Sequence, residues 1–132
     1  MRHLVAVLLV VVGIIHLLPL SGVIGAGRVA ALYGVDVAGP DLAILLRHRA
    51  VLFGLLGAFL VLAAFRPAWR GAALVAGFVS VVSFLALATM VGDYNARIGR
   101  VVLADWIALG CLLVAAAAHL RAQRLRRGPA DP

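Results

Sequence analysis

Arg47, His48 and Arg49 interrupt an apolar run that is otherwise long enough to cross a lipid bilayer. A charged side chain at the bilayer centre costs about 2.5–3.5 kcal/mol, and less near the interface. Arginine cannot lower that cost by losing its proton under physiological conditions. The triplet must therefore lie near a membrane surface or face partners inside a bundle, where its side chains could form an ion pair or bind a ligand.

Other polar residues are expected at the same level as this triplet. Intramembrane ionisable residues are functional candidates by default, and here each apolar run contributes to one end of the expected bundle. The predicted ligand-binding site consists of His16, Arg47, His48, Asp93, Tyr94 and Asp105. Arg47 continues a stripe of small residues at helical spacing, Ala50, Gly54 and Gly57, so we expect it to face inward. An inward Arg47 would pair with Asp93 or Asp105, because an unpaired buried charge costs several kcal/mol.

Each of these residues also has a simpler interpretation. Arg49 and Arg97 are expected to snorkel to the headgroups, and His48 to lie at the interface. His16 would then be a hydrogen-bonded packing residue, as most buried polar groups are. An Arg47–Asp pair would be only structural. The convergence of the polar residues on one end favours a ligand site over these alternatives.

Patterns typical of metal, phosphate or redox chemistry are missing from the sequence. It has no Cys-x-x-Cys, no Gly-rich phosphate loop and no His-Glu-x-x-His, and the one cysteine, Cys111, cannot form an internal disulfide. We therefore expect no metal and no cofactor. A haem between His16 and His48 is a geometrically conceivable alternative with weak support. No nucleophile with an adjacent base is visible, so the sequence leaves open whether the protein is an enzyme.

The composition predicts the elements that must position these residues. The chain is 65% hydrophobic, against about 45–50% in soluble domains. Four apolar runs, at about 4–20, 42–65, 71–91 and 101–120, predict an all-α, integral membrane four-helix bundle in a single domain, 1–120. The first run could instead be a signal peptide, but it is longer than the apolar part of a cleavable signal.

The segments between the runs have turn and interface signals. Residues 21–41 are rich in glycine and predict a loop with a short interfacial helix at 29–33, whereas 66–70 predicts a tight turn and 92–100 a polar turn. Residues 121–132 form a basic tail, in which 121–127 should continue the fourth helix before fraying at 128–129.

Small-residue stripes predict how the four helices pack. In the first run the stripe is Ala6, Leu9, Gly13 and His16, and in the second it is Ala50, Gly54, Gly57, Val61 and Ala64. The stripe expected for the third run is Ala76, Val79, Ser83, Ala86, Met90 and Asp93. The stripe in the fourth run is Ala104, Ala108, Cys111, Ala115 and Ala118, and Asp105 lies one residue off it.

The arginines predict the orientation. Seven of the 12 fall on the side of the two termini: Arg2, Arg66, Arg70, Arg121, Arg124, Arg126 and Arg127. The positive-inside rule therefore predicts that both termini, and the basic tail, are cytoplasmic. Basic residues that are all arginine and acidic ones that are all aspartate are typical of a GC-rich bacterial genome, so we expect a multi-pass protein of the bacterial inner membrane. The net charge of +7 is scattered between apolar runs, which indicates membrane flanks and no nucleic-acid partner.

Three stretches resemble the small four-helix bacterial membrane proteins of the DoxX-like superfamily. They are Gly13-Ile14-Ile15-His16, Leu32-Tyr33-Gly34, and Arg47 to Ala50 leading into Gly54 and Gly57. The resemblance covers about 4–120. It implies a four-helix membrane fold and a role as a small subunit of a quinone-reducing oxidoreductase or as an assistant to redox or maturation systems. The sequence lacks redox cysteine pairs, which argues against a disulfide role.

Two functions remain as hypotheses. The first is an accessory subunit of a larger membrane complex, respiratory or lipid-handling. It is favoured because no catalytic constellation is visible and the small-residue stripes could dock other helices. Its partners would be the bilayer and either a larger membrane protein or further copies of the chain. The alternative is a site that binds or isomerises a quinone, a sterol-like molecule or a lipid in the outer part of the bundle. A transporter ranks third, because four short helices leave little room for alternating access.

Overall fold

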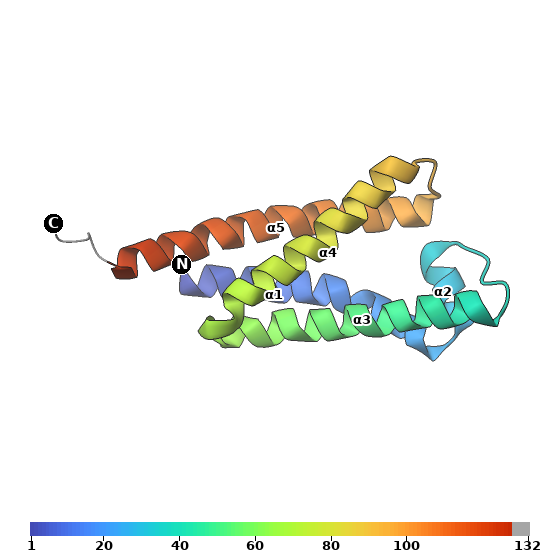
Figure 1. Ribbon diagram of the computed structural model, residues 1–132, viewed down its shortest axis with the longest axis horizontal. Helices are drawn as coiled ribbons and strands as arrows, with labels where there is room; N and C mark the ends of the chain where they lie inside the picture. Colours follow the sequence, from blue (N-terminus) through green and yellow to red (C-terminus); the bar gives the residue numbers. More distant parts are fainter. Residues whose placement is uncertain (128–132) are drawn as a thin grey trace.

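The computed structural model describes residues 1–127, and those residues are almost entirely helical (Figure 1). The first long helix, α1 (Arg2–Leu17), runs on into a 3₁₀ segment, η1 (Leu18–Ile24), at Pro19. The other long helices are α3 (Pro40–Phe65), α4 (Arg70–Val91) and α5 (Ala96–Arg127). Two short segments connect them, the helix α2 (Ala26–Tyr33) and the 3₁₀ turn η2 (Pro67–Trp69).

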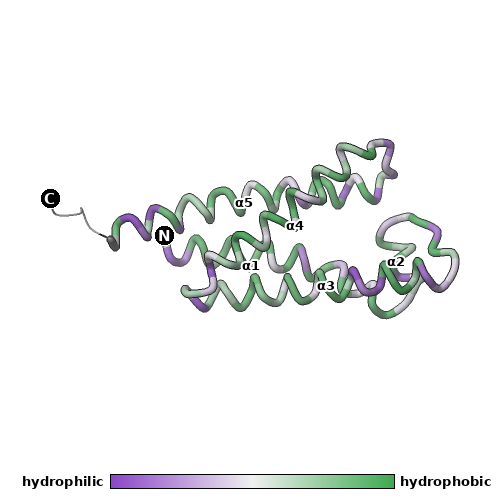
Figure 2. Tube along the Cα trace, in the orientation of Figure 1, coloured by the Kyte–Doolittle hydropathy of each residue, from purple (hydrophilic) through white to green (hydrophobic). Residues whose placement is uncertain are grey.

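Within the described part of the chain, four helical segments are long and apolar enough to cross a membrane. They are Arg2–Ile24, Pro40–Phe65, Pro67–Val91 and Ala96–Leu125. Large apolar side chains such as Ile44, Val79 and Leu103 point outward from them, and hydrophobic residues cover all four helices in Figure 2. An apolar outer surface of this extent is the surface of a multi-pass membrane protein. The predicted all-α bundle with four long apolar helices is confirmed.

The four helices form a ring in which each packs most extensively on two neighbours: α1 on α3 and α5, and α4 on α5 and α3. Side-chain hydrogen bonds also join α1 and α4. One end of the ring holds Met1, η2 and the last turns of α5; we name it the terminal end (Figure 1). The opposite end holds η1, α2 and the α4–α5 connection; we name it the loop end (Figure 1).

Two glycines bring α1 and α3 into backbone contact. A Cβ at Gly57 would lie 2.8 Å from the carbonyl oxygen of Gly13, and a Cβ at Gly13 would lie 2.9 Å from the carbonyl oxygen of Gly57. Ala50, Gly54 and Ala64 are also buried on α3. The predicted small-residue stripe of this helix therefore belongs to its packing face, as small residues commonly do in lipid.

The predicted packing face of α4 is wrong. Val79, Ser83, Ala86 and Met90 are exposed, and the residues that pack inward are Ala73, Leu74, Gly77, Val81 and Leu85. Every face of this helix is apolar and rich in small residues, because lipid and protein interior accept the same side chains. Residue size alone therefore did not identify the inner face. On α5, Ala108 and Ala115 are buried as predicted, together with Asp105 and Leu112.

The connections follow the prediction with one correction. The helix expected at 29–33 exists as α2, and 66–70 forms a tight turn. The polar turn is shorter than the predicted 92–100, because α5 already begins at Ala96. The side chain of Asn95 caps that helix by accepting hydrogen bonds from the backbone N–H groups of Arg97 (2.8 Å) and Ile98 (3.0 Å). α5 continues to Arg127 as predicted, and the expected fraying at 128–129 lies outside the described residues.

Candidate functional site

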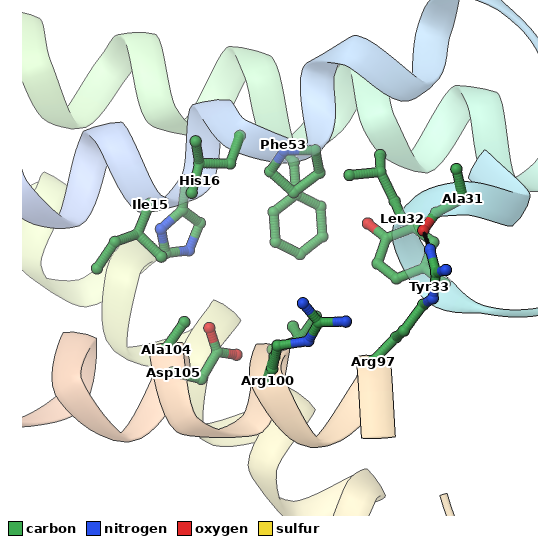
Figure 3. Close-up of a pocket in the computed structure, with 13 residues that line it drawn as sticks. Ile15, His16, Ala31, Leu32, Tyr33, Phe53, Arg97, Arg100, Ala104 and Asp105 are labelled. Carbon is green, nitrogen blue, oxygen red and sulfur yellow. Dashed lines mark hydrogen bonds between the residues drawn. The ribbon is translucent and has the colours of Figure 1, made fainter. Parts of the chain in front are cut away.

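A cavity of about 410 Å³ opens at the loop end, between α1, η1, α2, α3 and α5 (Figure 3). Its walls are mostly apolar, with a few polar side chains. The lining residues that matter below are His16, Tyr33, Phe53, Arg97, Arg100 and Asp105. Its size and lining suit one small, largely apolar ligand. Two of the six residues predicted for the site, His16 and Asp105, are brought together here.

His16 is held rigidly at the inner end of the cavity, 2% exposed. Its Nδ1 donates a hydrogen bond to the carbonyl oxygen of Val12 (2.9 Å), because a carbonyl can only accept. In the neutral imidazole Nε2 is then an acceptor, and it lies 3.2 Å from the hydroxyl oxygen of Ser80. The ring also stacks on Phe53, with ring centroids 5.6 Å apart. These contacts fix the orientation of the imidazole ring, as expected of a packing residue. The ring also lines the cavity, so it could contact a ligand as well.

Asp105 faces His16 from α5 on the opposite wall (Figure 3). It is 6% exposed, yet among the described residues its carboxyl group has neither a hydrogen-bond partner nor an ion-pair partner. Buried carboxyl groups are almost always hydrogen-bonded, since an unpaired buried polar group costs free energy. The Asp105 carboxyl group therefore faces the cavity as a hydrogen-bond acceptor, and none of the described residues donates to it.

Arg49 lies inside the bundle next to the cavity, contrary to the prediction that it snorkels to the headgroups. The carbon at the centre of its guanidinium lies 4.6 Å from the ring centroid of Phe53, 5.1 Å from that of Tyr33 and 5.8 Å from that of Phe84. Aromatic faces attract a cation at such distances. Three aromatic rings therefore hold this half-buried arginine beside the cavity.

The prediction that Arg47 faces the bundle interior and pairs with an aspartate is also wrong. Arg47 is exposed, and its Nε donates to the carbonyl oxygen of Val23 in η1 (3.0 Å). The buried face of α3 includes Leu60 and Ala63 besides the small-residue stripe. At about 100° per residue, these two residues move the centre of the face away from Arg47 and toward Arg49.

The other predicted site residues lie outside the cavity. His48 is exposed on α3, and Asp93 and Tyr94 are exposed in the α4–α5 connection, where Asp93 has a positive φ of 45°. His48 and His16 do not meet in the cavity, so this geometry does not support a haem between them. No group of three or more His, Cys, Asp or Glu residues within 1–127 is arranged to hold a metal ion.

Side chains from the start of α5 fasten α2 over the cavity. Nδ2 of Asn95 donates to the carbonyl oxygens of Tyr33 (2.9 Å) and Gly34 (3.2 Å), and Nη1 of Arg97 donates to the carbonyl oxygen of Ala31. The last carbonyls of a helix have no partner within that helix, so these bonds complete α2. Gly34 ends α2 with a positive φ of 65°, which brings its backbone against Asn95 and Arg97. Tyr33 and Arg97 thus form the wall at this side, where Arg100 also points inward (Figure 3).

Five residues in or beside the cavity were not predicted to belong to the site: Tyr33, Arg49, Phe53, Arg97 and Arg100. Phe53 lies four residues after Arg49, so both fall on one face of α3, and this spacing could have identified the pair. Nothing in the sequence shows that α2 folds back over the cavity, which is what brings Tyr33 to the site.

We expect Arg49→Ala to lower the thermal stability of the protein in detergent more than Arg47→Ala does. The first change removes contacts with three rings, worth about 1–2 kcal/mol for a partly desolvated cation. The second removes one exposed hydrogen bond, worth about 1 kcal/mol or less. Equal losses in the two variants, or a larger loss for Arg47→Ala, would contradict the inward position of Arg49.

Comparisons of the chain with protein-family models, with curated proteins and with solved structures found no match. Membership of the DoxX-like superfamily therefore stays a prediction, and the function rests on the geometry of the cavity.

Proposed function

We propose that the protein binds one small, largely apolar molecule with a hydroxyl-bearing head in the cavity at the loop end. The observation that carries this proposal is Asp105, a residue that is 6% exposed and lies in a mostly apolar cavity wall, with a carboxyl group that is unpaired among the described residues. A ligand hydroxyl that donates to this carboxyl would satisfy it, and the apolar walls would bury the remainder of the molecule.

The other polar side chains of the cavity indicate which polar group the ligand carries. His16 offers an Nε2 acceptor that it already shares with the hydroxyl of Ser80, so acceptors line the inner part of the cavity. Arg97 and Arg100 supply donors at the opening. This division favours a ligand whose deepest polar group is a donor. A quinol or a sterol-like alcohol has that character, whereas a quinone carbonyl can only accept.

We expect the protein to bind decylubiquinol at least about tenfold more tightly than decylubiquinone. A hydrogen bond to a charged group contributes about 1.5–3 kcal/mol, and 1.4 kcal/mol is a factor of ten in affinity. Native mass spectrometry of the purified protein, titrated with each probe under reducing or oxidising conditions, measures both affinities. A sterol and its 3-ketone form a second matched pair.

Asp105→Asn should remove the preference for the alcohol, because an amide can donate as well as accept. Asp93→Asn makes the same chemical change at an exposed aspartate of the loop end and should leave the preference intact. Equal binding of both members of each pair by the unmodified protein would exclude the proposed role of Asp105.

The accessory-subunit hypothesis stays a prediction, and so do the isomerase activity, the cytoplasmic position of the termini and the bacterial inner membrane. A ligand site and a role within a larger complex are compatible. Purification in mild detergent, followed by mass spectrometry of proteins and small molecules together, measures both.

A further inference from the structure

A buried arginine lies at the terminal end, far from the cavity described above. Arg70, the first residue of α4, is 7% exposed. Its Nη1 donates to the carbonyl oxygen of Arg2 (3.1 Å) and its Nη2 to that of Ala64 (2.6 Å), so it joins the start of α1 to the end of α3. Its Nε is buried and has no hydrogen-bond partner within residues 1–127. Two bonds therefore use only part of the five-donor capacity of the guanidinium.

The charge of Arg70 has no anionic partner in the described part of the chain. The guanidinium makes no ion pair there, and its two partners are neutral carbonyl groups. The neighbouring charge is another cation, Arg2, whose side chain lines the same cavity. A more than nine-tenths buried cation beside a second cation is costly unless an anion joins them.

That second cavity has a volume of about 230 Å³ and is lined by Arg2, Pro67, Ala68, Arg70, His119, Ala122 and Gln123. Among the described residues, its lining contains no acidic side chain. His119 and Gln123 contribute polar side chains from α5 to this cavity, and their Nε2 atoms are 3.0 Å apart. Positive charge, further hydrogen-bonding groups and small volume suit a tetrahedral oxyanion.

We propose that this cavity binds a phosphate group, with Arg70 and Arg2 as its cations and His119 and Gln123 as further polar partners. The cavity lies where three spans end: Arg2 begins the first, Pro67 begins the third, and Gln123 is near the end of the fourth. This is the depth of the lipid headgroups, so a lipid phosphate can reach the cavity with its chains along the bundle. A soluble phosphate compound would present the same group from the water.

Arg2→Gln is the variant that tests the site without breaking the fold. Arg70 bonds to the backbone carbonyl of Arg2, which the substitution keeps, whereas the exposed side chain of Arg2 lines the cavity. Arg66→Gln is the matched control: the residue is exposed at the same end and is not part of the lining. The probes are phosphatidylglycerol and phosphatidylcholine in mixed micelles, and inorganic phosphate alone. Native mass spectrometry counts bound lipid, and thermal unfolding measures stabilisation by each probe.

The unmodified protein should retain phosphatidylglycerol, and Arg2→Gln should bind it at least about fivefold more weakly, with Arg66→Gln unchanged. Stabilisation by inorganic phosphate that Arg2→Gln alone abolishes, without lipid retention, would support the same site with a soluble ligand. Equal weakening by Arg2→Gln and Arg66→Gln would reduce the effect to general surface charge and overturn the proposal. The proposal would also be overturned if neither phosphatidylglycerol nor phosphate bound. Arg70 would then serve only to connect α1, α3 and α4 through its hydrogen bonds.

Discussion

Gly57→Leu is expected to be the most destabilising single change in the bundle. A Cβ at this position would lie 2.8 Å from the carbonyl oxygen of Gly13, 3.0 Å from the backbone nitrogen of Leu17 and 2.8 Å from its Cγ. The first two atoms belong to the backbone of α1, so the contact can be relieved only by moving the helices apart. Extra methylene groups in a packed core typically cost about 1–3 kcal/mol, and a contact with backbone should exceed that range.

Thermal unfolding in detergent measures the effect, with Gly57→Ala as a milder step in the series. Gly110 supplies the control, because a Cβ there meets no atom within 4 Å. Gly110→Leu should therefore be neutral, or stabilising by up to about 1 kcal/mol through helix propensity. If the Gly57 and Gly110 variants unfold at the same temperature, α1 and α3 do not approach each other at Gly13 and Gly57.

Asp105→Asn is expected to make the ligand-free protein more stable while it impairs binding. Asp105 is 6% exposed and its carboxyl group is unpaired within residues 1–127, so removing this charged group from most of its contact with water opposes folding. Taking a charged group out of water without a partner costs up to several kcal/mol, and an uncharged amide of similar volume costs less. A substitution that raises stability and weakens binding is characteristic of a residue whose role is to bind a ligand.

The measurement is the unfolding temperature of lipid-stripped protein, followed by titration with decylubiquinol. Asp93→Asn controls for the loss of one negative charge. Asp93 is exposed with a positive φ, and asparagine tolerates that backbone conformation as well as aspartate does. A clear loss of stability in Asp105→Asn would show that the carboxyl group has a structural partner, and the ligand proposal would then lose its main support.

The spans could be predicted from the sequence because their signal is simple. Long apolar runs bounded by Pro, Gly and Arg mark where helices must begin and end in lipid. The glycines of α3 could also be predicted, since backbone approach requires small residues wherever two helices touch. His16 and Asp105 were selected because ionisable residues inside apolar runs need a reason to be there.

The inner faces of the helices were harder to predict. In a water-soluble bundle the outer face is polar and so reveals the inner one, but here both are apolar. The face of α4 was therefore assigned to exposed residues such as Val79. On α3 the small-residue stripe defined only one edge of a wider buried face, so Arg47 was placed inside and Arg49 outside. The burial of Arg70 depends on the α1–α4 arrangement, which the local sequence does not encode.

The hydrogen bonds from Asn95 and Arg97 to the end of α2 have a consequence for the dynamics of the loop end. An isolated helix of eight residues is not stable, so α2 depends on its surroundings. Part of that support comes from side chains more than 60 residues further along the chain, at the beginning of α5. Local unfolding of α2 and fraying of the first turn of α5 should therefore be one cooperative event. α2 and the first turn of α5 then open together as one folding unit, although they are far apart in the sequence. Amide hydrogen exchange in both segments should report the same opening free energy.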